Sequence, residues 1–152
     1  MSSRTNHLTA YKTLKIKKTA VDIIVGLFVL LFIYTAVSKL MDYDETELSM
    51  SKSPIITEFA HILVWLVPVL EIVISLLLLW PKSTLWGLYS AFGLMVMFTA
   101  YIVFILNFSD HIPCSCGGVI SSLSWSQHLI FNIAFIILAL IAISLNPERN
   151  ND

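Results

Sequence analysis

Four long apolar segments, separated by short polar stretches, set the pattern of the chain. They run over about residues 21–40, 62–80, 85–108 and 129–145. Each is close to the roughly twenty apolar residues that an α-helix needs to cross the hydrocarbon core of a bilayer. The sequence therefore predicts an all-α integral membrane protein in which residues 21–146 form one domain, a four-helix transmembrane bundle.

Composition places the chain in the same class. Of the 152 residues, 57% are hydrophobic and 12% are charged, and the mean hydropathy is +0.84. A soluble domain usually has about a quarter charged residues, so this chain lacks the polar surface of a soluble protein. The net charge of -1 gives no support for binding to nucleic acid, and the partner that composition implies is the lipid bilayer.

The first stretch, residues 1–20, is polar and basic and is expected to form a cytoplasmic tail. It contains no acid, and its basic residues are Arg4, Lys12, Lys15, Lys17 and Lys18. The apolar segment that follows is longer than the core of a signal peptide and lacks a small-residue cleavage site. We therefore expect it to remain in the protein as the first transmembrane helix.

The distribution of charge predicts the orientation of the bundle. Apart from Lys39 and Lys52, every basic residue falls in residues 1–20, in the turn at 81–84 or in residues 147–152. An acidic stretch after the first segment and the loop before the last segment fall on the opposite side. By the positive-inside rule, both termini are expected in the cytoplasm and this loop outside it. In a bacterium, this describes a multi-pass protein of the inner membrane whose loop faces the periplasm.

The second apolar segment contains two anomalies, Pro68 and Glu71. A proline within a helix removes a backbone hydrogen bond, which a membrane tolerates where neighbouring groups satisfy the exposed carbonyl. A charged carboxylate near mid-membrane costs at least about 2.5 kcal/mol on insertion scales, so Glu71 is expected to face the bundle interior, neutral or paired. Two interpretations stay open: a proton site or cofactor ligand, and a structural carboxyl bonded to a neighbouring helix. The partners considered for that bond are Tyr34, Ser38, Tyr89 and Tyr101.

Aromatic and small residues fit the bundle as structural elements. Four tryptophans fall near expected interfaces, where an amphipathic ring is favoured, and they are Trp65, Trp80, Trp86 and Trp125. The third segment has a partly small face suited to close helix packing, formed by Gly87, Ser90, Ala91 and Gly93. Met95 and Met97 are expected to serve packing rather than metal binding.

The loop before the last segment holds the chain's two cysteines, Cys114 and Cys116, after Pro113 and before Gly117 and Gly118. Outside the cytoplasm disulfides form and persist, so we expect the two thiols to pair for part of the time. A Cys-x-Cys disulfide closes a very small ring, and strained, exposed disulfides are easily reduced, which suits exchange. It would add little stability, because loop closure stabilises most when the loop is long. The alternative is a locally rigid bridge or two unreactive thiols.

Two histidines and the glycine pair bear on the reactivity of this loop. As an imidazolium, His111 would lower the pKa of a nearby thiol, and the backbone amides of Gly117 and Gly118 would help to stabilise a thiolate. His128, at the start of the last segment, has either a direct role or only a solvated position. A separate alternative is metal handling, because His111 and the two cysteines would suit Cu(I) or Zn. No further residue completes such a site, and we assign no metal ligands.

Several motifs together resemble a known family. They are "SKLMD" at the end of the first segment, "VPVLEIVISLLLL" in the second, and "CSCGG" followed by "LSWSQHLIFNIAFIILALIAI" in the last. From residue 21 to residue 145 the chain resembles the MauE family of DoxX-like membrane proteins. This resemblance implies a four-helix bundle similar to those of vitamin K epoxide reductase and DsbB. Its motif residues correspond to Lys39, Pro68, Glu71, Cys114, Cys116 and Asn132. Where such proteins often read Cys-Gly-Cys-Phe-Gly, this chain has Ser115 and Gly117.

The resemblance implies a role in periplasmic thiol redox or protein maturation. MauE is thought to assist maturation of a disulfide-rich methylamine dehydrogenase subunit alongside a thioredoxin-like partner. The leading interpretation is thus thiol-disulfide exchange between Cys114/Cys116 and a thioredoxin-like partner or a disulfide-containing client. With two cysteines the chain holds one disulfide only, so an outside partner completes any reaction. A quinone near Glu71 is a further expectation, for which no sequence motif is present. The principal alternative is a non-enzymatic membrane subunit or assembly factor of a larger transporter or maturation complex.

Overall fold

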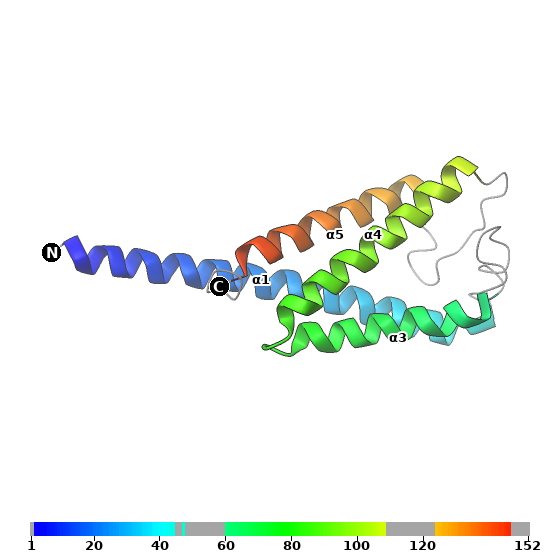
Figure 1. Cartoon of the computed structure of the whole chain (residues 1–152), viewed down its shortest axis with the longest axis horizontal. Coiled ribbons are helices and arrows are strands. Elements are labelled where there is room, and N and C mark those ends of the chain that lie inside the picture. Colours follow the sequence, from blue (N-terminus) through cyan, green and yellow to red (C-terminus); the bar gives the residue numbers. More distant parts are fainter. Residues whose placement is uncertain (1, 45–46, 48–59, 109–123, 147–152) are drawn as a thin grey trace.

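The computed structural model describes residues 2–44, 47, 60–108 and 124–146. The described part of the chain contains four long helices (Figure 1): α1 (Ser2–Met41), α3 (Ala60–Leu79), α4 (Thr84–Phe108) and α5 (Trp125–Leu145). Each of them is long and apolar enough to cross a membrane. This confirms the predicted fold class, an all-helical, multi-pass bundle.

The helices contact one another in a closed ring. α1 packs mainly against α3 and α5, and α4 packs against the same two helices from the other side. The core between them includes Phe28, Phe32, Leu88 and Ala139, none of them more than 1% exposed. Phe28 also meets Phe135 of α5 edge to face, with ring centroids 5.1 Å apart. These contacts fix the rotation of each helix, and therefore which of its residues face inward.

α1 is much longer than a membrane requires. Its 40 residues would extend about 60 Å at 1.5 Å per residue, roughly twice the thickness of a hydrocarbon core. The excess lies at the N-terminal end, where α1 projects beyond the other helices (Figure 1). The basic stretch expected as a tail is therefore helical up to Ser2, and it continues the first span without a break.

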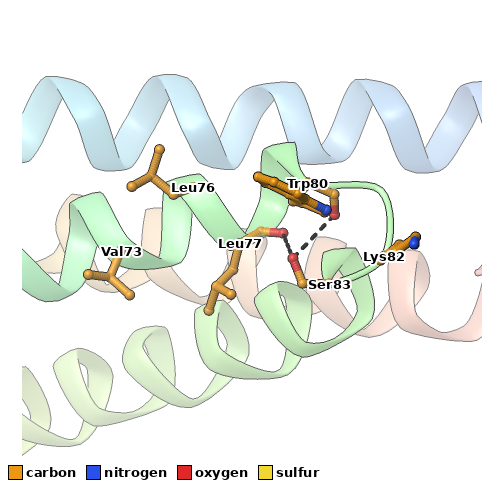
Figure 2. Close-up of a pocket in the computed structure, with 6 residues that line it drawn as sticks. All are labelled: Val73, Leu76, Leu77, Trp80, Lys82 and Ser83. Atoms are coloured by element: carbon orange, nitrogen blue, oxygen red, sulfur yellow. Dashed lines mark hydrogen bonds between the residues drawn. The ribbon is translucent and has the colours of Figure 1, made fainter.

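A tight turn joins α3 to α4. The hydroxyl of Ser83 donates to the carbonyl of Leu77 at 2.9 Å and to that of Trp80 at 3.3 Å (Figure 2). The hydroxyl of Thr84 also donates to the carbonyl of Trp80, at 3.0 Å. The Ser83 hydroxyl satisfies the Leu77 carbonyl, which lacks a helical donor because Pro81 has no N–H, and the Trp80 carbonyl also accepts from the backbone N–H of Ser83 at 3.0 Å. The turn is thus held by its own side chains.

Only some of the small residues of the third span are buried in helix packing. Gly87 and Ala91 are buried, whereas Ser90 and Gly93 are exposed, so the expected small face is correct only for the first pair. Met95 is 2% exposed and Met97 is 56% exposed, so Met95 belongs to the core and Met97 faces outward. No metal role is needed for either. Three of the tryptophans are exposed, as expected of interfacial anchors: Trp65, Trp80 and Trp86.

Gly87 and Gly93 provide a matched test of this packing. A Cβ added at Gly87 would lie 2.9 Å from the backbone nitrogen of Leu78, whereas a Cβ at Gly93 would meet nothing within 4 Å. We expect Gly87→Ala to destabilise the bundle by about 1–3 kcal/mol, the usual cost of overpacking. Gly93→Ala should not lower stability. Thermal unfolding of the purified variants in detergent checks this, and equal behaviour of the two would contradict the close approach of α3 and α4.

Candidate functional site

A buried ion pair joins α1 to α3. The ammonium of Lys39 lies 2.6 Å from Oε1 of Glu71, and the side chains of Lys39 and Glu71 are 12% and 1% exposed. Side chains on a helix point toward its N-terminus, so Lys39 reaches back from the last turn of α1 into the bundle. Glu71 therefore faces inward and is paired, which agrees with its predicted inward position. Lys39 was predicted as a motif residue, but its pairing with Glu71 was not predicted.

The side chains found beside the Glu71 carboxylate are Lys39 and Thr35 of α1, which were not among the partners considered. Tyr34 and Tyr89 are 40% and 47% exposed, and their positions on the outer faces of α1 and α4 explain the difference. Thr35, one turn before Lys39 on α1, instead lies beside the Glu71 carboxylate. The helical spacing of Thr35 and Lys39 places both on the face of α1 that meets α3. Since the facing surface depends on helix rotation, the apolar pattern alone does not identify it.

The pair lies among other groups that the bundle brings inward. The ring centroid of Phe98 on α4 is 5.6 Å from the Lys39 ammonium, close enough for a cation-π interaction. The hydroxyl of Ser75 donates to the backbone carbonyl of Glu71 at 2.8 Å. Pro68, buried one turn earlier, lies within α3 without ending it. Within the described residues, Oε2 of Glu71 has no hydrogen-bond partner.

α5 carries two further predicted site residues, Asn132 and His128. Asn132 is 2% exposed, and its Nδ2 has no hydrogen-bond partner among the described residues. His128, one turn before it and partly buried, is within electrostatic range of the Lys39 ammonium. Four residues apart on a helix, the two side chains share one face. α1 and α3 thus supply the ion pair, α4 supplies the ring of Phe98 beside the Lys39 ammonium, and α5 supplies His128 within electrostatic range of that ammonium.

The start of α5 is held firmly. Ser124 caps the helix, and its hydroxyl accepts from the backbone N–H of Gln127 at 3.4 Å. In return, the side-chain oxygen of Gln127 accepts from the backbone N–H of Ser124 at 2.9 Å. This capping box fixes the point at which the chain enters α5 after the cysteine-bearing loop. The sequence "SWSQ" carries the motif, which the prediction did not use.

The other predicted site residues lie outside the described residues. They are His111, Pro113, Cys114, Cys116, Gly117 and Gly118, all between the end of α4 and Ser124. The connectivity of the chain attaches their segment to α4 at Phe108 and to α5 at Ser124. Those two attachment points lie at the end of the bundle where α1 ends and α3 begins (Figure 1). Lys39 and His128 belong to that same end.

The same end of the bundle carries an exposed polar cluster that was not predicted from the sequence. Nδ1 of His61 lies 3.3 Å from Oε1 of Glu47 and 3.5 Å from the hydroxyl of Tyr43. The ring of Tyr43 packs on Trp65, with centroids 5.7 Å apart. Desolvation raises the pKa of Tyr43 above its ordinary value, and the carboxylates of Glu47 and Asp44 act in the same direction, so the phenol stays neutral at physiological pH.

Metal ligands do not gather in the described part of the chain. Across residues 2–44, 47, 60–108 and 124–146, no three side chains of histidine, cysteine, aspartate or glutamate form a group that could hold an ion. The metal alternative rested on His111, Cys114 and Cys116, which lie outside these ranges. It therefore stays an alternative that the described residues do not test.

The fold and its buried ion pair define a class, the multi-pass membrane proteins built as four-helix bundles. Within that class, the family model described as "Methylamine utilisation protein MauE" matches residues 17–145. Because this match covers most of the chain, the protein belongs to the MauE family, as its motifs indicated. Comparisons with curated proteins and with solved structures gave no match.

The two partners of the ion pair should respond differently to substitution. Lys39→Met leaves the Glu71 carboxylate, 1% exposed, without its counter-charge, and we expect a loss of about 3–5 kcal/mol in stability. Glu71→Gln should cost less, because Lys39 lies in the last turn of α1 and its flexible chain can turn the ammonium toward water. The measurement is unfolding of each purified variant in detergent.

The double variant Lys39→Met with Glu71→Leu serves as the control. It removes both charges together, so it should recover most of the stability that Lys39→Met loses. A double variant as unstable as Lys39→Met would mean that lost packing, and not an unpaired buried carboxylate, explains the cost.

Proposed function

We propose that this protein exchanges thiol and disulfide between its Cys114/Cys116 pair and a thioredoxin-like or client protein outside the cytoplasm. One observation supports this proposal above the others. The chain segment that carries both cysteines is attached, through Phe108 and the capped start of α5, to the end of the bundle that holds Lys39 and His128. A reactive loop anchored at both ends on a rigid scaffold suits repeated exchange with a partner.

The exchange itself needs only two sulfur displacements. A thiolate of the pair attacks one sulfur of a partner disulfide, which forms a mixed disulfide and releases the other partner sulfur as a thiolate. The second cysteine of the pair, as a thiolate, then attacks its neighbour's sulfur. This step forms the Cys114–Cys116 disulfide and releases the partner as a dithiol. Two electrons pass from the pair to the partner, and the same steps run backward for a partner that arrives reduced.

Family membership supports a role in protein maturation. The family takes its name from methylamine utilisation, and the motif resemblance links MauE to maturation of a disulfide-rich subunit. We infer a disulfide-containing client for this member without assigning it to amine metabolism. The pair holds a single disulfide, so a second redox protein must restore it after each turnover.

Single-cysteine variants test the exchange. One of the two cysteines attacks the partner, and the other resolves the mixed disulfide. Of Cys114→Ser and Cys116→Ser, the variant that lacks the resolving thiol should accumulate a mixed disulfide with its partner. Both variants should lose exchange down to the uncatalysed rate. Non-reducing electrophoresis of membranes, with identification of the adduct by mass spectrometry, provides the measurement.

The double variant Cys114→Ser with Cys116→Ser is the matched control and should show no adduct. If it keeps full activity and retains a stoichiometric partner, the protein acts as a non-enzymatic subunit or assembly factor. Full activity of both single variants without any adduct would equally contradict the exchange mechanism.

Orientation is tested by the same two thiols. We propose that the cysteines face the periplasm and that the α3–α4 turn faces the cytoplasm, because the basic residues gather at the turn and the termini. A maleimide that does not cross membranes should label Cys114 and Cys116 in intact, pre-reduced cells. In a variant without these cysteines, Lys82→Cys should be labelled only after the membrane is opened. The reverse pattern would overturn the orientation.

A further inference from the structure

A hollow of about 350 Å³ lies on the surface near the end of α3 (Figure 2). Its lining residues are Val73, Leu76, Leu77, Trp80, Lys82 and Ser83. The first four supply apolar walls, and Lys82 supplies a cation where the span ends. An apolar surface followed by a cation complements a phospholipid, in which an acyl chain is followed by an anionic phosphate.

The walls of the hollow are exposed toward the surroundings of the bundle. Val73, Leu76 and Trp80 are 46%, 61% and 66% exposed, so they do not belong to the protein core. Val73 and Trp80 are seven residues apart on α3, which corresponds to about 10 Å along the helix axis. The strip therefore runs from within the span to its end, where the indole of Trp80 has the amphipathic character favoured at a membrane interface.

The frame of the hollow is rigid before any ligand binds. Ser83 is fixed by its hydrogen bonds to the carbonyls of Leu77 and Trp80, and Thr84 bonds the carbonyl of Trp80 as well. The close approach at Gly87 holds the start of α4 against the end of α3. A site that is already ordered loses less conformational entropy on binding, which favours a defined ligand position.

The charge at this end favours an anion. Lys82 is exposed, and no carboxylate pairs with it among the described residues. Lys17 and Lys18 add positive charge shortly before Val21, whose side chain belongs to the same core cluster as Leu78 and Leu88. The exposed Asp22 offsets only part of this positive charge. Anionic headgroups are attracted by about 1 kcal/mol for each nearby lysine or arginine.

We propose that this hollow is a binding site for an anionic phospholipid. One acyl chain packs along Val73, Leu76 and Trp80, and the phosphate pairs with the Lys82 ammonium. The site is separate from Lys39 and Glu71. It would fix the depth and tilt of the α3–α4 turn in a leaflet rich in anionic lipid, and it holds whether or not the exchange reaction is correct.

Native mass spectrometry of the full-length protein in detergent tests this proposal. Phosphatidylglycerol should remain bound where phosphatidylcholine with the same acyl chains does not. Lys82→Gln should weaken phosphatidylglycerol binding at least about fivefold, as expected from one lysine. Lys12→Gln is the matched control, because it removes the same charge from the exposed part of α1 and should change binding much less. Leu76→Gln should also weaken binding, because it places a polar group on the apolar wall.

Four outcomes would overturn the proposal. Equal losses for Lys82→Gln and Lys12→Gln would mean diffuse attraction to anionic lipid rather than a site. Equal retention of phosphatidylcholine, which has the same phosphate but no net charge, would mean that the hollow does not select an anionic headgroup. Displacement of the lipid by millimolar inorganic phosphate would indicate a site for a free anion. A dimer that Leu76→Gln dissociates, with no bound lipid, would mean that a second copy of the chain covers the hollow. Thermal unfolding equal to that of the unmodified protein shows that each variant is folded.

Discussion

The absence of water inside a bilayer is the constraint on which this structure depends. A carboxylate at the depth of Glu71 has no solvent to accept its charge, so the bundle must supply a counter-charge, and Lys39 supplies it at 2.6 Å. The pair joins α1 to α3, and it requires a particular rotation of both helices. Beside the pair, the hydroxyl of Ser75 donates to the backbone carbonyl of Glu71.

The number and approximate position of the spans could be predicted from the sequence, because a membrane span is a matter of length and apolar composition. The rotation of each helix could not be predicted, because apolar side chains occur on all sides of each span. α3 therefore shows no clear inward face in its sequence. That is why Glu71 was correctly placed inside while its partner was missed. The helical state of residues 2–20 was missed for a related reason: the stretch is too polar to span, and nothing in its hydropathy distinguishes a helix from an irregular tail.

The candidate site was likewise predicted only in part from the sequence. Lys39, Glu71 and His128 were each predicted separately, and the fold brings Glu71, His128 and the ring of Phe98 near the Lys39 ammonium, while Asn132 is buried on α5. The cysteine pair was found from residue type, spacing and expected compartment, and it lies in the segment outside the described residues. The exchange chemistry therefore rests on the sequence, whereas the scaffold that anchors this segment rests on the structure. The capped start of α5 connects the two arguments, because it fixes where that segment re-enters the bundle.

The unequal exposure of the two charges has a consequence for how the protein is made. α1 leaves the ribosome before α3, so Lys39 is in place, near the end of its span, when Glu71 enters the membrane. Until then, the Lys39 side chain can keep its ammonium in water at little cost, because it lies near the end of its helix. Glu71 lies in the middle of its helix, and its carboxylate cannot reach water in this way. We therefore expect the second span to insert against the first as a helical pair. The order of the two charges along the chain makes biogenesis sequential, with the earlier helix serving as the receptor for the later one.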